Sequence, residues 1–121
     1  MQLLYQADTQ GLGADELLES LPLDPDRYAI AAVRGVHADI ERIDAALEVH
    51  STDWPVRRMP IVDRAIVRLA AWELYERPDV PTPVILDEAV ELAKDYSTER
   101  SPAFVNGVLD ALARAVRAGD S

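Results

Sequence analysis

The chain has 121 residues, about the length of one domain, and 49% of them are hydrophobic, as a folded globular core requires. It has no cysteine, which excludes disulfides, thiolate metal sites and cysteine nucleophiles. No apolar run approaches the roughly 18 residues of a membrane span, and no signal-peptide pattern opens the chain, so we expect a cytoplasmic protein without membrane contact. The net charge of −10 disfavours binding to nucleic acid, which usually draws on a basic surface. Residues 51–121, with nine basic side chains, are the better candidate for such a surface than residues 1–50, with three.

The first expected elements are two short helices. The segment Gln2 to Thr9 has helical spacing and is followed by Gly11 and Gly13, which favour the end of a helix. The segment Asp15 to Leu21 is the second helix, and Pro22 ends it.

Proline marks the starts of three longer helices. Asp24-Pro25, Thr82-Pro83 and Ser101-Pro102 each combine a good N-cap side chain with a proline suited to the first helical position. From Pro25, apolar residues keep helical spacing as far as Leu47, which predicts one long helix. Gly35 is the position at which this helix could bend. No stretch alternates between apolar and polar residues as a strand would, so the predicted fold class is all-α.

The segment from Pro60 to Arg77 is apolar around nearly its whole circumference, which predicts a central helix. Only a narrow polar strip remains, formed by Arg64, Arg68 and Tyr75 with Asp63 on its flank. Any contact that this helix makes with a partner therefore runs through these side chains.

The sequence lacks the residue patterns that are typical of catalytic sites and metal sites. Glu73 falls on an apolar stripe and is interpreted as a structural carboxylate that accepts hydrogen bonds from a neighbouring helix end. His37 lies on or beside a buried stripe and His50 lies at a helix end, where a cation is favoured by the dipole, so both are given structural roles. Neither histidine completes a Glu-x-x-His pair of a helical di-metal site. Glycine-rich phosphate loops and strained nucleophile turns are also missing. We therefore expect neither an enzyme nor a cofactor. The helix from Pro83 to Tyr96 carries a solvated acidic face, made of Asp87, Glu88, Glu91 and Asp95.

Four segments together resemble the NusB family of transcription antitermination factors. They are Leu3-Leu4-Tyr5-Gln6, Asp63 to Ala70 followed by Glu73-Leu74, Pro81 to Lys94, and Phe104-Val-Asn-Gly-Val-Leu-Asp110. The resemblance covers nearly the whole chain, and the last string is the most specific. It implies a single helical domain over residues 1–121, made of two three-helix bundles packed side by side.

The resemblance also implies a function. Family members join the ribosomal protein NusE to bind boxA RNA, and the complex helps RNA polymerase read through terminators in ribosomal RNA operons. They usually begin with an arginine-rich extension before the first helix, whereas this sequence starts at Met1 within that helix. We therefore expect a truncated first helix and a weaker affinity for RNA.

The resemblance assigns RNA-binding roles to three residues. Tyr5 and Phe104 are expected to stack on bases, with Phe104 partly exposed at the edge of its helix, and Arg100 is expected to reach a phosphate. The alternative is that both aromatic residues are ordinary core residues.

The partner NusE is expected to contact the central helix. By resemblance, Asp63, Arg64 and Arg68 form the side of this helix that faces the partner. The alternative for these residues is a solvated helix strip.

Two other functions are compatible with the sequence. The chain could be a protein-interaction module of NusB fold without intrinsic RNA binding, which the net charge favours. It could also be the NusB-like domain of a ribosomal RNA cytosine methyltransferase, although we expect no catalytic domain after the last helix. A homodimer that shelters the RNA-binding face is a further alternative.

Overall fold

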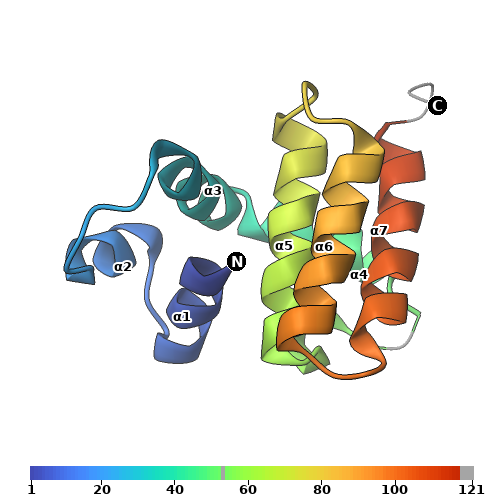
Figure 1. Cartoon of the computed structure of the whole chain (residues 1–121), viewed down its shortest axis with the longest axis horizontal. Helices are drawn as coiled ribbons and strands as arrows, with labels where there is room; N and C mark the ends of the chain where they lie inside the picture. The colour runs from blue at the N-terminus through green and yellow to red at the C-terminus, as the bar shows by residue number, and fades with distance from the viewer. Residues whose placement is uncertain (53, 118–121) are drawn as a thin grey trace.

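The computed structural model describes residues 1–52 and 54–117, and within them all regular structure is helical (Figure 1). The prediction of an all-α fold is confirmed. None of the helices in these two ranges is long and apolar enough to cross a membrane. A short 3-10 helix covers Val56–Arg58, and the α-helices are α1 (Gln2–Gln10), α2 (Ala14–Ser20), α3 (Arg27–Ala38), α4 (Ile40–His50), α5 (Ile61–Glu76), α6 (Thr82–Tyr96) and α7 (Ser101–Val116).

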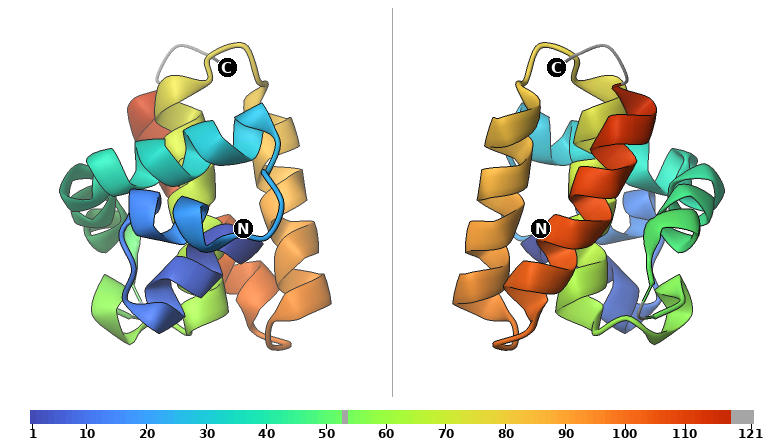
Figure 2. Two further views of the ribbon diagram at one scale, coloured as in Figure 1. Left: turned by 90° about the vertical axis from the view of Figure 1, so that its left-hand side faces the viewer. Right: turned by 90° about the vertical axis from the view of Figure 1, so that its right-hand side faces the viewer.

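The helices form two bundles that pack side by side, as predicted. Helices α1, α2 and α3 make one bundle, and α5, α6 and α7 make the other, with α4 packed against α5 and α7 (Figures 1 and 2). Helix α5 is the central element because it contacts helices of both bundles. Val67 and Ala71 on α5 are fully buried, in agreement with the apolar circumference seen in the sequence.

The long helix predicted from Pro25 to Leu47 is wrong, because the chain forms two helices separated at Asp39. The break occupies a single residue, and the N–H of Asp39 still donates to the carbonyl of Gly35. The apolar residues therefore stay close to helical register across the break, which hides it in the sequence pattern. Gly35 lies within α3 and permits close packing: a Cβ atom there would lie 2.0 Å from the indole nitrogen of Trp72.

The helices begin and end close to the predicted residues, but the capping interactions differ from those predicted. Gly11 ends α1 with φ +66°, a left-handed conformation that favours glycine. Asp26, rather than Asp24, caps α3 by accepting a backbone N–H bond. Helices α6 and α7 begin at Thr82 and Ser101 themselves, with the prolines in the first turn. The hydroxyl groups of these two residues make tertiary hydrogen bonds instead of caps.

Candidate nucleic-acid interface

A groove runs between the first turns of α7 and the segment that follows α4. It has a volume of about 870 Å³ and brings together two of the residues expected to bind RNA, Arg100 and Phe104. Small side chains on the α7 face keep it open, and a Cβ atom at Gly107 would meet nothing within 4 Å. The groove, hereafter the α7 groove, is lined by His50, Thr52, Trp54, Glu99, Arg100, Ala103, Phe104, Gly107, Val108 and Ala111.

An aromatic pair forms one wall of the α7 groove. The ring of Phe104 meets that of Trp54 edge to face, with 4.9 Å between ring centroids and 71° between the planes. Phe104 is only 8% exposed, so the expectation that it is partly exposed is wrong. Trp54 covers it and is itself partly exposed. Sequence reasoning missed Trp54, although a tryptophan in the polar segment before Pro55 was a usable signal.

The charged groups of the α7 groove favour an anion at one end. Arg100 is exposed at the N-cap position of α7, where the positive end of the helix dipole adds to its charge. It makes no ion pair with any residue in the described ranges, so its guanidinium donors face solvent. His50 lies in the last turn of α4, and Glu99 contributes a carboxylate that opposes Arg100. A ligand with both a flat ring and a phosphate matches this arrangement.

Tyr5 lies apart from this groove. It belongs to α1 in the other bundle and is 40% exposed, but it is not among the residues that line the α7 groove. The structure therefore unites Arg100 with Phe104 and leaves Tyr5 on a separate surface.

Asp63 lies in the interior, so the prediction that it contacts a partner on the surface is wrong. Its side chain is 0% exposed, and its carboxylate accepts hydrogen bonds from the hydroxyl groups of Ser97 and Ser101, the latter at 2.8 Å. The turn between α6 and α7 folds over the first turn of α5 and excludes water from the carboxylate. The sequence could not reveal this, because the two serines lie 34 and 38 positions away.

Arg64 and Arg68 do form a strip on α5, but their guanidinium groups bind carboxylates of this chain. Nε of Arg64 lies 2.7 Å from Asp8 of α1, and Arg68 makes two bonds of 2.9 and 2.7 Å to Asp44 of α4. The two arginine side chains are 15% and 17% exposed. The strip is therefore an ionic network that joins α1, α5 and α4, and it is not freely solvated.

Glu73 is a structural carboxylate, as interpreted, but its partner is a side chain. The hydroxyl of Tyr28, in the first turn of α3, donates to it across the boundary between the bundles. Burial raises the pKa of Glu73, and the bond from Tyr28 acts in the opposite direction. The pKa of Tyr28 is raised as well, first by burial and then by its bond to Glu73.

Comparisons with known proteins agree with this architecture. The model of the NusB family matches residues 1–114. The transcription antitermination protein NusB of Sorangium cellulosum (strain So ce56) is 47% identical, over 93% of this chain and 85% of the relative. A solved structure of T. maritima NusB matches with a TM-score of 0.82 and 34% identity, covering 93% of this chain and 84% of that one. Because sequence, helix order and packing all agree along most of its length, the chain belongs to the NusB family.

Proposed function

We propose that this chain is a transcription antitermination factor that binds boxA RNA together with the ribosomal protein NusE, within an antitermination complex of RNA polymerase that reads through ribosomal RNA operons. Family membership and the name of the Sorangium relative support the role in antitermination. The observation that carries the RNA-binding part is the aromatic wall of the α7 groove beside the exposed Arg100. The proposal includes no catalytic step and no cofactor.

The α7 groove suits single-stranded RNA. An unstacked base can lie on an aromatic ring, which is worth about 1–3 kcal/mol, and Trp54 presents the accessible ring. Arg100 can then bind the adjoining phosphate with two parallel hydrogen bonds. Phe104 is nearly buried and packs edge to face against Trp54, so its proposed role is to support that ring. Tyr5, on its separate surface, is proposed as a second aromatic contact for the RNA.

The net charge of −10 explains why a second protein belongs in the proposal. RNA binding gains affinity by releasing counterions from phosphates, and this acidic chain supplies few cations for that. A basic partner on the same RNA would compensate. We place NusE on the side of α5 where Arg64 and Arg68 hold α1 and α4 in position, with these arginines shaping the contact surface.

A second candidate function is a protein-interaction module that carries no RNA affinity of its own. The same net charge favours it. Both candidates predict a complex with NusE, and only the first predicts that boxA RNA binds the α7 groove.

Fluorescence anisotropy of labelled boxA RNA, with and without NusE and at several salt concentrations, tests the proposal. Arg100→Gln should lower the slope of log affinity against log salt by about 0.7, the value for one lost phosphate contact on a single strand. Arg114→Gln is the matched control, because Arg114 lies on the same helix, is 80% exposed and pairs with Asp110. It removes the same charge and should leave the slope nearly unchanged.

The aromatic contact is tested by two substitutions of Trp54. Trp54→Ala should weaken RNA binding by about 1–3 kcal/mol, and Trp54→Phe should restore most of the loss, because a ring is still present. Circular dichroism verifies that the variants are folded. No RNA binding by the chain alone, together with an RNA affinity of the NusE complex that neither Trp54→Ala nor Arg100→Gln changes, would replace this proposal by the interaction module.

A further inference from the structure

The arginines that lack a carboxylate partner gather beside the α7 groove. Of the twelve basic side chains, seven form ion pairs within the described ranges, and Arg117 donates to backbone carbonyl groups. The four that remain are Arg27, Arg57, Arg58 and Arg100. Arg100 lines the α7 groove, and Arg57 and Arg58 follow Trp54, which also lines it, by three and four positions. In a chain with a net charge of −10, these exposed cations give one surface a local positive charge.

The 3-10 helix η1 (Val56–Arg58) explains why Arg57 and Arg58 both point outward. A 3-10 helix has about three residues per turn, so positions three apart lie on the same side. Val56 and Met59 are such a pair, and they are buried in the core, 5% and 3% exposed. Arg57 and Arg58 take the other two directions and are exposed. The sequence Val-Arg-Arg-Met therefore anchors η1 by its apolar residues and presents two guanidinium groups to solvent.

A series of contacts leads from η1 to α1, the helix that carries Tyr5. The guanidinium of Arg64, on α5, donates to the carbonyl groups of Val56 and Arg57, each at 3.4 Å. Nε of the same arginine binds Asp8 of α1 at 2.7 Å. Tyr5 precedes Asp8 by three positions, less than one turn of α1. The segment η1 therefore lies between the α7 groove, which Trp54 lines, and the surface of Tyr5.

The carboxylates nearest to η1 leave its arginines available. Glu48 of α4 accepts a backbone N–H bond from η1 at 2.8 Å, and Asp8 is engaged by Arg64. Within the described ranges, neither carboxylate forms an ion pair with Arg57 or Arg58. The two guanidinium groups can therefore bind an external anion without breaking an internal contact.

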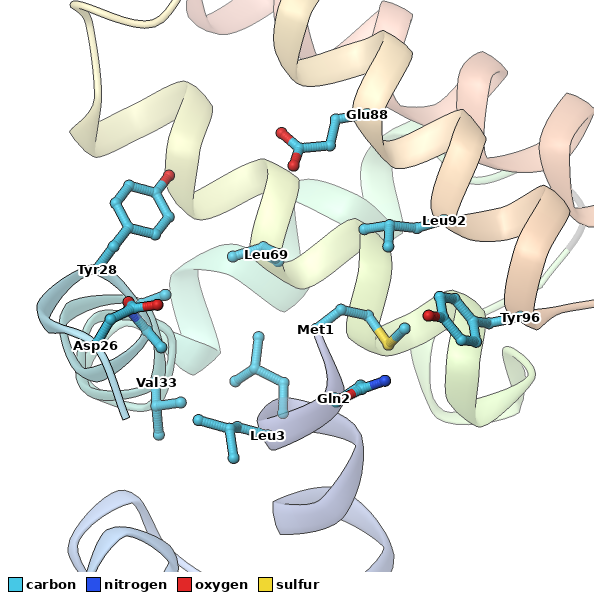
Figure 3. A pocket seen from close by; sticks show the side chains of 13 residues that line it. Met1, Gln2, Leu3, Asp26, Tyr28, Val33, Leu69, Glu88, Leu92 and Tyr96 are labelled. Atoms are coloured by element: carbon cyan, nitrogen blue, oxygen red, sulfur yellow. The ribbon is translucent and has the colours of Figure 1, made fainter. Parts of the chain in front are cut away.

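The pocket between α1, α3 and α6 offers no comparable site for phosphate. Figure 3 shows Asp26 and Glu88 among the side chains around it. None of the described residues that line it is a lysine or an arginine. Met1 also lines this pocket, and burial lowers the pKa of its amino group. A phosphate there would approach two carboxylates, so charge favours the η1 side as the course of RNA between the α7 groove and α1.

We propose that Arg57 and Arg58 bind phosphates of single-stranded RNA that leaves the α7 groove and runs over η1 toward Tyr5. This RNA path rests on the proposed function and deepens it, because it joins the α7 groove and the separate surface of Tyr5 into one binding surface. Each guanidinium can bind a phosphate with two parallel hydrogen bonds. Contacts to phosphate carry no sequence information, so η1 adds affinity and direction while the aromatic residues contact bases.

Fluorescence anisotropy of boxA RNA with NusE present, over a series of salt concentrations, tests these contacts. Arg57→Gln and Arg58→Gln should each lower the slope of log affinity against log salt by about 0.7, and the double variant by about twice that. Arg27→Gln is the matched control, because Arg27 is also exposed and outside the ion pairs of the described ranges, but lies at the start of α3 in the other bundle. It removes the same charge and should leave the slope unchanged.

The course of the RNA is tested by shortening it one nucleotide at a time, in one series from each end. In one of the two series, the effect of Tyr5→Ala on affinity should vanish first. The effect of the double variant of Arg57 and Arg58 should vanish next, and that of Arg100→Gln last. A different order in both series would overturn the path over η1.

Three further outcomes overturn the inference. The first is a slope that Arg100→Gln lowers and that Arg57→Gln and Arg58→Gln leave unchanged, in which case the proposed function stands without the η1 contact. The second is weaker binding of NusE to the double variant in the absence of RNA, which would make η1 a protein contact, since it borders the surface proposed for NusE. The third is a chain that binds no RNA with or without NusE, which refutes the RNA part of the proposed function as well.

Discussion

At the scale of single residues, Gly35 has a role that only its neighbours reveal. It lies in the middle of α3, where glycine costs about 0.5–1 kcal/mol relative to alanine. The indole of Trp72 occupies the space that a side chain would need, which brings α3 and α5 into close contact. The loss in helix propensity is thus offset by packing between the two bundles.

Gly35→Ala should therefore destabilise the protein by about 1–3 kcal/mol, the usual cost of overpacking, even though alanine is the better helix former. Urea unfolding measures the change. Gly107→Ala is the control, since Gly107 is also helical but has open space where a Cβ atom would lie, and it should stabilise by about 0.5–1 kcal/mol. Equal effects of the two substitutions on the free energy of unfolding would show that the close contact with Trp72 does not affect stability.

At the scale of elements, α7 holds both ends of the central helix. Ser101, at the start of α7, donates to the buried carboxylate of Asp63 in the first turn of α5. Arg117, just after α7, donates to carbonyl oxygens at the end of α5, including those of Glu73 and Arg77. Carbonyl groups at this helix end thereby accept further hydrogen bonds from a side chain of another element.

Ser101→Ala should lower the free energy of unfolding by about 1–3 kcal/mol, because the buried carboxylate of Asp63 loses the hydrogen bond from the Ser101 hydroxyl. A double-mutant cycle of Ser101→Ala and Asp63→Ala, followed by urea unfolding, measures the interaction. We expect the double variant to lose less stability than the sum of the single variants. Strict additivity would contradict a direct interaction. Asp63→Arg would be tolerated at an exposed position. Because Asp63 is buried, we expect this substitution to unfold the start of α5.

At the scale of the whole molecule, the contact between the two bundles contains an ionisable pair. Tyr28 of α3 donates to Glu73 of α5, and the ring of Tyr28 also meets that of Trp72 edge to face, with 5.7 Å between centroids. Because burial raises the pKa of Glu73 above its ordinary value of 4.5, the folded state binds a proton there more tightly than the unfolded state does. The docking of the bundles is therefore coupled to pH.

The sign of this coupling follows from the raised pKa. The contribution of Glu73 to stability is fully present below pH 4.5 and is lost as the pH rises through the folded-state pKa. Glu73→Gln keeps an acceptor for Tyr28 and removes the titration. The unfolding free energy of this variant relative to the unchanged chain should rise with pH over that window. Glu91→Gln is the exposed control, and a constant difference across the pH series would contradict the assignment to Glu73.

Local patterns in the sequence are enough to predict the helical class, the central position of α5 and the family. Apolar periodicity reports which face of a helix is buried, and prolines report where helices start, so these features depend on residues close together in the chain. The string from Phe104 to Asp110 carried the family resemblance in the same local way. The break at Asp39 was not predicted, because a single irregular residue hardly disturbs the helical spacing of the apolar residues.

Which polar residues lie on the surface and which lie in the interior depends on tertiary contacts. Asp63 and Arg64 are neighbours in sequence and equally polar, yet the first is enclosed by serines of a distant turn and the second is tied to Asp8 of α1. Trp54 becomes a candidate base contact because Phe104, fifty positions later, packs beneath it. Burial and pairing are set by the sum of all neighbours, most of them remote in the chain, and a local pattern contains no record of those neighbours.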